Sequence, residues 1–157
     1  MGNGYPVSAV GMTDEIASRL EKSAFHYAQS HQNDPLGCAV AKEVIAVIQE
    51  EGLVESSGRA RHEFLEELQR LGERHAVVKD VRGRGLMIAM ELTDELIGTM
   101  VYERLLADGF LAGWKPVAKV LRFYPPLAVG EADLSRLVEA LDGALEEAVA
   151  ADVARGT

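Results

Sequence analysis

The alternation of apolar and polar positions divides the chain into helix-like and strand-like stretches. Apolar residues at helical spacing predict helices over 14–23, 36–51, 56–71, 94–108 and 131–149. Short apolar or valine-rich runs bounded by turn residues predict strands over 7–12, 76–81, 86–92, 110–112 and 120–124. Residues 25–34 have no period and predict a loop, whereas residues 150–157 predict a loose tail.

Residues with strong local preferences mark several of these boundaries. Thr13 can cap the first helix with its hydroxyl. Pro35 suits the first position of the next helix, with Asn33 or Asp34 as its cap. Residues 82–85, Arg-Gly-Arg-Gly, contain two glycines that permit a bulge or a positive φ where they join two strands.

The order of these elements predicts an α+β fold. We expect a small antiparallel or mixed sheet of three or four strands with helices packed on one side. The first 30 or so residues do not belong to that layer. The core is expected to contain the apolar faces of two long helices and three methionines, namely Phe64, Leu65, Leu68, Leu71, Leu134, Leu137, Val138, Leu141, Leu145, Met87, Met90 and Met100.

Composition narrows the classes of function. A formal net charge of −9 argues against binding to nucleic acid or to anionic membrane surfaces, which require clustered Lys and Arg. No apolar run approaches the roughly 20 residues of a membrane-spanning helix. The single cysteine, Cys38, cannot form an internal disulfide, favours a cytoplasmic location and is expected to be buried on a helix face. The four histidines lack partners at metal-site spacing, so we expect no metal.

Four segments together resemble the class III pyridoxal-phosphate aminotransferases, in the order that the family has them. They are 2–6 (Gly-Asn-Gly-Tyr-Pro), 30–39 (Ser-His-Gln-Asn-Asp-Pro-Leu-Gly-Cys-Ala), 81–87 (Val-Arg-Gly-Arg-Gly-Leu-Met) and 120–127 (Val-Leu-Arg-Phe-Tyr-Pro-Pro-Leu). The resemblance covers nearly the whole chain. Within the family, the chain resembles enzymes of the ornithine, acetylornithine and 4-aminobutyrate aminotransferase type.

The resemblance implies the C-terminal portion of a fold-type I enzyme. Residues 1–34 would be the end of its large cofactor-binding domain, including a strand and a helix, and residues 35–157 the linking helix and small domain. In the family the cofactor lysine precedes the Gly-Tyr-Pro turn, which places it two residues before Met1. We therefore expect no catalytic lysine in this chain, no activity from it alone, and weak or no binding of pyridoxal phosphate outside the intact enzyme.

Arg82 is the predicted substrate-binding residue. A planar guanidinium can bind a carboxylate through two hydrogen bonds, and the resemblance implies that the matching arginine does so in many members, or pairs with an acid until substrate arrives. The alternative is a surface arginine beside a bulge. Arg122 is expected to pair with an acid across the small domain, and Arg84 to be solvated. Trp114 and Tyr124 are expected to be core or rim aromatics.

Ser30 and His31 are the predicted cofactor-binding residues. The resemblance places Ser30 where the family has a threonine that reaches the cofactor phosphate of the neighbouring subunit, and a serine keeps the hydroxyl. His31 would line the same interface loop. The alternative for Ser30 is a loop residue that caps a turn.

The implied partners are an amino acid or amine donor and a 2-oxo acid acceptor, with a homo-oligomeric assembly. Ornithine-like, 4-aminobutyrate-like and β-alanine-like donors all remain open. A second hypothesis is a non-catalytic interaction or assembly module derived from an aminotransferase small domain.

Overall fold

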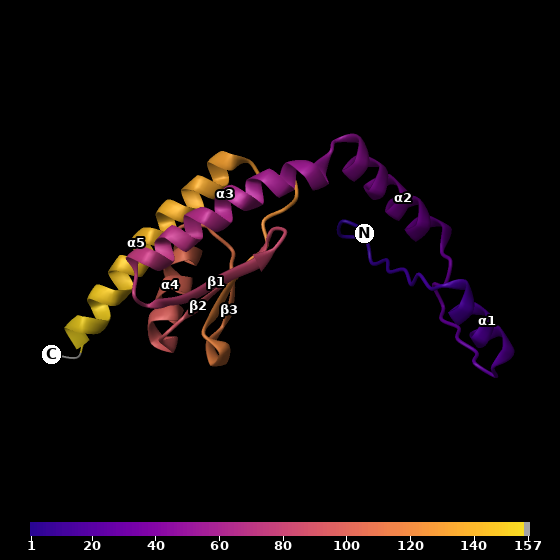
Figure 1. Ribbon diagram of the computed structural model, residues 1–157, viewed down its shortest axis with the longest axis horizontal. Coiled ribbons are helices and arrows are strands. Elements are labelled where there is room, and N and C mark those ends of the chain that lie inside the picture. Colours follow the sequence, from indigo (N-terminus) through magenta and orange to yellow (C-terminus); the bar gives the residue numbers. More distant parts are fainter. Residues whose placement is uncertain (156–157) are drawn as a thin grey trace. The chain divides into compact units, whose positions relative to one another are not determined.

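The computed structural model describes residues 1–155, without the side chains of residues 59–61, and divides the chain into two compact units, Met1–Gly52 and Leu53–Thr157 (Figure 1). The elements in order are α1 (Asp14–Lys22), α2 (Pro35–Glu50), α3 (Leu53–Arg74), β1 (Val78–Arg84), β2 (Met87–Leu92), α4 (Glu95–Ala107), β3 (Gly113–Lys115), the 3₁₀ helix η1 (Pro116–Ala118), β4 (Val120–Phe123) and α5 (Glu131–Arg155). The predicted boundary at residues 34/35 concerns the domains of a longer enzyme and stays a prediction.

The first unit contains α1, α2 and the segments that flank them. The predicted caps are present: Thr13 Oγ1 accepts a hydrogen bond from the backbone N–H of Ile16, and Asp34 Oδ1 accepts one from Leu36, directly before α2. The N-terminal turn packs against α2, because Tyr5 lies within van der Waals distance of the position that a Cβ on Gly37 would take. Gly37 therefore admits the tyrosine ring beside the helix.

Two predictions for this unit are wrong. Residues 7–12 form no strand, although they are extended and apolar, because no other strand of the described residues pairs with their backbone groups. Cys38 is exposed, because no described residue covers its side chain on α2, although its neighbour Gly37 is buried. The predicted loop over 25–34 is confirmed, as those residues adopt neither helix nor strand.

The second unit is an α+β layer, as predicted. Its four strands form one antiparallel sheet in the order β1-β2-β4-β3. Helices α3, α4 and α5 pack on one side of the sheet, where α3 contacts β1 and α5, and α4 contacts α5 (Figure 1). Side chains that alternate along β2 and β4 enter this core, which includes Phe64, Leu68, Leu71, Ile88, Met90, Leu92, Leu121, Phe123, Leu141 and Leu145.

Some predicted boundaries of the second unit need correction. Residues 82–84 belong to β1, and the hairpin turn is Gly85-Leu86; the register shift lies between Val78 and Asp80. Strand β3 begins at Gly113 because residues 110–112 form only the approach to it. Helix α5 continues to Arg155, so the predicted tail is helical as far as it is described.

Glycines fix the shape of the β1–β2 hairpin. Gly85 has φ of +59° at the first position of the two-residue turn, as a type II′ turn requires. A Cβ on Gly83 would lie 2.7 Å from the backbone oxygen of Met87, so a side chain there would push the two strands apart. The Arg-Gly-Arg-Gly segment therefore serves strand pairing and the turn.

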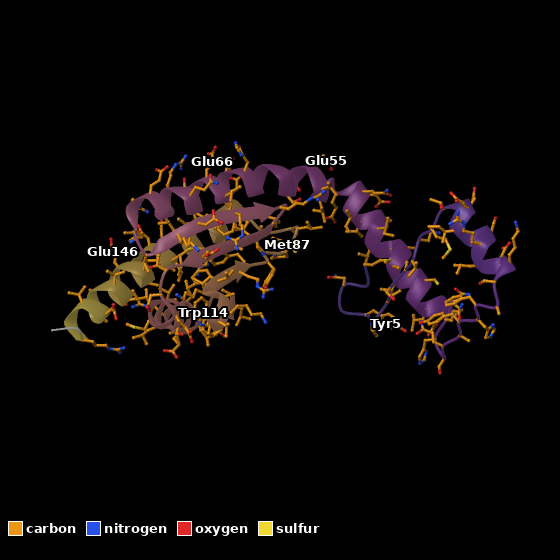
Figure 2. All side chains as sticks on the ribbon, turned by 60° about the horizontal axis from the view of Figure 1, so that its bottom comes forward. Tyr5, Glu55, Glu66, Met87, Trp114 and Glu146 are labelled. Atoms are coloured by element: carbon orange, nitrogen blue, oxygen red, sulfur yellow. The ribbon has the colours of Figure 1, made fainter. Side chains whose placement is uncertain are left out.

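Trp114 locks β3 onto α4. Trp114 is labelled in Figure 2. Its indole N–H donates a hydrogen bond to Thr99 Oγ1 at 3.1 Å, and its ring lies against Gly98 of α4. This confirms the prediction of a core aromatic. Met87, by contrast, is 64% exposed at the hairpin, so its prediction as a core residue is wrong.

A pair of glycine-to-alanine variants tests this lock. In Gly98→Ala the new Cβ would lie 2.1 Å from the nearest ring carbon of Trp114, and we expect the free energy of unfolding to fall by about 1–3 kcal/mol. Gly143→Ala is the control, because no atom lies within 4 Å of its Cβ position in α5, and we expect a gain of about 0.5–1 kcal/mol. Urea unfolding followed by the fluorescence of the chain's single tryptophan reports on this unit alone. Equal midpoints for the two variants would contradict the lock.

Within residues 1–155, no helix combines the length and the apolarity that crossing a membrane requires.

Candidate functional site

The sheet of the second unit has one face that the helices leave open. Because side chains alternate along each strand, Arg82, Ala89, Arg122 and Gly113 form one row across the four strands of this face. The row beside it contains Asp80, Glu91, Val120 and Lys115. The charged side chains of the sheet therefore gather on its open face, opposite the core.

Arg82 lies in a network of ion pairs over β1 and β2. Its Nη1 atom is 2.5 Å from Asp80 Oδ2 and 3.0 Å from Glu91 Oε2, and Lys79 Nζ is 2.5 Å from the other oxygen of Glu91. Two cations and two carboxylates thus neutralise one another. The predicted substrate-binding arginine is exposed, yet its guanidinium is already engaged.

The same contacts shift the protonation equilibria of the network. Hydrogen bonds from Lys79 and then from Arg82 hold the pKa of Glu91 below its ordinary value. Hydrogen bonds to Asp80 and then to Glu91 raise the pKa of Arg82. Because the pKa of Glu91 is lowered on folding, its ion pairs stabilise the fold at neutral pH, and this contribution is lost as the pH falls through the folded-state pKa.

Arg122 occupies the same row on β4, one strand beyond Ala89. The prediction that it pairs with an acid is wrong for the described residues, in which no carboxylate forms an ion pair or a hydrogen bond with it. The reason is positional, since both carboxylates of the open face, Asp80 and Glu91, lie toward the β1 edge and are held there. Arg122 is half-buried and available to a ligand.

Tyr124 and Gly113 border Arg122 on the open face. The Tyr124 hydroxyl is 2.9 Å from the position that a Cβ on Gly113 would take, and Arg122 Cβ is 3.4 Å from it. The glycine therefore lets the tyrosine ring lie across β3. Tyr124 is 53% exposed, which agrees with the predicted rim position.

Ser30 and His31 lie in the first unit, in the turn before α2. Backbone hydrogen bonds from Gln32 to Gln29 and from Asp34 to His31 close this turn, which contains Asn33 at φ of +59°. Ser30 is exposed, and its hydroxyl makes no hydrogen bond within the described part of the chain. His31 Nδ1 is 3.5 Å from Asp34 Oδ2, with the imidazole 87% exposed. The predicted cofactor residues thus belong to one unit and Arg82 to the other.

One of the two predicted cofactor-binding side chains, Ser30, has chemistry suited to a phosphate group. The turn at Ser30 offers the phosphate an unengaged hydroxyl. Two lysines of the second unit are engaged by other residues. Lys79 pairs with Glu91, and Lys119 Nζ donates a hydrogen bond to the backbone oxygen of Thr93. Among the described residues, no group of three or more His, Cys, Asp or Glu side chains could hold a metal ion.

Sequence reasoning missed the contrast between the two arginines. Both stand in strands between apolar neighbours, and only the strand register shows that they share a row with Ala89 between them. The signal in the sequence was the alternation along 120–124. It places Arg122 on one face of the strand and the buried Leu121 and Phe123 on the other face. It does not reveal which arginine the two acids engage.

The comparisons with known proteins agree with the fold and with the motifs. The family model described as "Aminotransferase class-III" matches residues 1–145. The chain is 35% identical over 150 residues to acetylornithine aminotransferase of Methanocaldococcus jannaschii, covering 94% of this chain and 36% of the relative. It is 30% identical over 157 residues to mitochondrial alanine–glyoxylate aminotransferase 2 of Homo sapiens, covering 94% of this chain and 30% of the relative.

Solved structures of transaminases are also similar to this chain. A transaminase from the marine bacterium Virgibacillus superposes with a TM-score of 0.79 at 26% identity, covering 87% of this chain and 34% of that structure. An amine transaminase from an uncultivated Pseudomonas species, solved with pyridoxal phosphate bound, superposes with a TM-score of 0.76 at 26% identity. The match covers 86% of this chain and 34% of that structure. The chain spans about a third of the length of the relatives that it matches.

Proposed function

This chain belongs to the class III aminotransferases, and we propose that it acts as the C-terminal part of an enzyme that moves an amino group between an amino acid or amine and a 2-oxo acid. The observation that carries the proposal is the family match over residues 1–145. The open sheet face supports it, because it presents arginines to a ligand on a rigid antiparallel sheet.

Pyridoxal phosphate would supply the electron sink for the reaction when bound. This chain would contribute the hydroxyl of Ser30 to the phosphate, with His31 beside it in the same turn. The lysine that the reaction needs would come from outside the described residues. We therefore propose that the chain alone has no transaminase activity and holds the cofactor weakly or not at all.

The substrate carboxylate requires a cation on the open face. We propose two candidates for this role. The sequence suggested Arg82, but the substrate would have to displace Asp80 or Glu91 from its guanidinium. We favour Arg122, because no carboxylate of the described residues competes for it. A buried or half-buried cation that lacks a partner gains most from a ligand carboxylate.

We further propose that the enzyme is a homo-oligomer in the cytoplasm. Exposed apolar side chains of the first unit, such as Phe25 and Leu36, support an assembly that covers them. The location rests on the single Cys38; one relative is mitochondrial by its name. Light scattering of the intact protein measures the oligomeric state, and a monomer would contradict the proposed homo-oligomer.

A chimeric enzyme tests the proposed activity. This chain replaces the matching C-terminal segment of the Methanocaldococcus jannaschii acetylornithine aminotransferase, which aligns over 150 residues. We expect the chimera to retain pyridoxal phosphate through dialysis, seen as absorbance at about 410–430 nm, and to transfer amino groups to a 2-oxo acid. The 157-residue chain alone, treated identically, should show neither property.

The outcomes separate the two hypotheses. A folded chimera that retains the cofactor but transfers no amino group would favour the non-catalytic assembly module. Cofactor absorbance retained by the chain alone, and abolished when borohydride fixes the cofactor to one of its lysines, would overturn the expected inactivity. The relative without its C-terminal segment is the control for residual activity.

A further inference from the structure

A groove lies where the three helices of the second unit meet the ends of β1 and β2. Its volume is about 670 Å³, which is within the range of sites that take small molecules. Its lining includes Arg74, His75, Val77, Thr93, Ile97 and Glu146. Of the described residues that line the groove, none belongs to the two rows of the open sheet face. The groove is therefore separate from the arginines proposed for the substrate carboxylate.

The floor of the groove is apolar and is held in place by the fold. Val77 and Ile97 are 8% and 7% exposed and belong to the core of the unit. The backbone N–H of Thr93 donates a hydrogen bond of 2.8 Å to the backbone oxygen of Val77, which fixes the two sides of the floor to each other. On α5, Val149 follows Glu146 by three residues, so both side chains lie on one face of the helix. An alkyl chain in the groove would thus contact a preformed apolar surface.

The charged groups at the α3 end of the groove engage one another. Asp142 lies one turn before Glu146 on α5, and its two oxygens are 2.5 Å from His75 Nε2 and 2.9 Å from Arg74 Nη2. Glu146, by contrast, is exposed on α5 (Figure 2). Its carboxylate forms no ion pair or hydrogen bond within the described part of the chain. The groove therefore presents one carboxylate without a cationic partner beside an apolar floor.

We propose that this groove binds a primary alkylamine, whose ammonium group pairs with Glu146 while its alkyl chain covers Val77 and Ile97. Charge complementarity selects this class of ligand. A carboxylate would be repelled by Glu146, and to reach a cation it would have to displace Asp142 from Arg74. An uncharged ligand would leave the Glu146 carboxylate hydrated and gain nothing from it. The site goes beyond the proposed amino transfer, because it holds an amine away from the open face and takes no part in the reaction.

Binding of matched probes to the full 157-residue chain tests the inference. Pentylammonium and 1-pentanol share their alkyl chain and differ in the charge of the end group. Titrations followed by the backbone amide NMR signals of Thr93 and Val149, which line the groove, give the dissociation constant of each. We expect pentylammonium to bind about fivefold more tightly than 1-pentanol, as for one exposed ion pair, with a ratio that shrinks as salt is added. Ethylammonium should bind about tenfold more weakly than pentylammonium, because it has three fewer methylene groups to cover the floor.

Two neighbouring glutamates of α5 identify the residue responsible. In Glu146→Gln the ratio of the dissociation constants for 1-pentanol and pentylammonium should fall to about one. Glu147→Gln is the matched control and should preserve the ratio, because Glu147 pairs with Arg104 and does not line the groove. An unchanged ratio in Glu146→Gln overturns the inference, as do equal affinities for 1-pentanol and pentylammonium, or for ethylammonium and pentylammonium, in the unmodified chain. Each of these results would leave the amino transfer of the chimeric enzyme standing, so the two proposals fail separately.

Discussion

Replacing Arg122 with glutamine in the chimeric enzyme is expected to lower kcat/KM for amino transfer by about 100-fold. The substrate carboxylate would lose a charge-assisted contact on a half-buried cation, and losing one partner of such a pair typically costs a factor of this order or more. Steady-state kinetics with a 2-oxo acid measure the loss. Arg122→Lys should recover part of the activity, because it restores the charge without the planar geometry.

Arg82→Gln provides the matched comparison on the same face. If Asp80 and Glu91 hold Arg82 as a structural pair, this variant should lose less than about tenfold in kcat/KM. The reverse order, with the larger loss at Arg82, would identify Arg82 as the carboxylate partner and exclude Arg122 from that role. Circular dichroism of both variants is needed, since a hairpin disordered by the loss of Arg82 would lower activity for a different reason.

The layer arrangement of the second unit could be predicted because local signals and packing agree there. The apolar face of α3, from Phe64 to Leu71, keeps the helical period throughout, and it meets a sheet whose strands keep their own two-residue alternation. The predicted position of β3 was wrong by three residues, because a strand of only three residues gives a weak local pattern. Its position is set by Trp114 on Gly98, a contact between elements that no local pattern contains.

The first unit shows the opposite case. Residues 7–12 have the composition of a strand, but a strand needs backbone partners, and the described residues provide none. Cys38 has the character of a buried residue, and its burial would likewise depend on what covers α2. Both errors have one cause: sequence pattern reports the preference of a segment, whereas pairing and burial depend on its neighbours.

The candidate site was predicted in part for the same reason. The motif around Arg82 drew attention to the sheet on which the candidate site is proposed, because planar cations on a rigid strand suit a carboxylate. The pattern could not show that Asp80 and Glu91 engage Arg82, since Glu91 reaches it only through the antiparallel register. Once the strands are paired, the unengaged cations are found at Arg122 and Lys115.

The largest expected effect on stability comes from Leu121. Its side chain is fully buried in β4, between Met90 of β2 and Trp114 of β3, so truncation leaves a cavity enclosed by two neighbouring strands and the helices. We expect Leu121→Ala to lower the free energy of unfolding of the second unit by about 2–5 kcal/mol. Urea unfolding followed by the fluorescence of Trp114 should show a lower midpoint with an unchanged slope.

Leu111→Ala is the matched control, because it deletes the same atoms from a side chain that is 88% exposed. Its midpoint of urea unfolding should correspond to a change in the free energy of unfolding within about 0.5 kcal/mol. Similar losses for the two variants would mean that β4 is not the centre of the core, and the open face opposite Leu121 would then lack its rigid support. The burial of Leu121 and the positions of Arg122 and Lys115 are linked in this way, since all three depend on the pairing of β3 with β4.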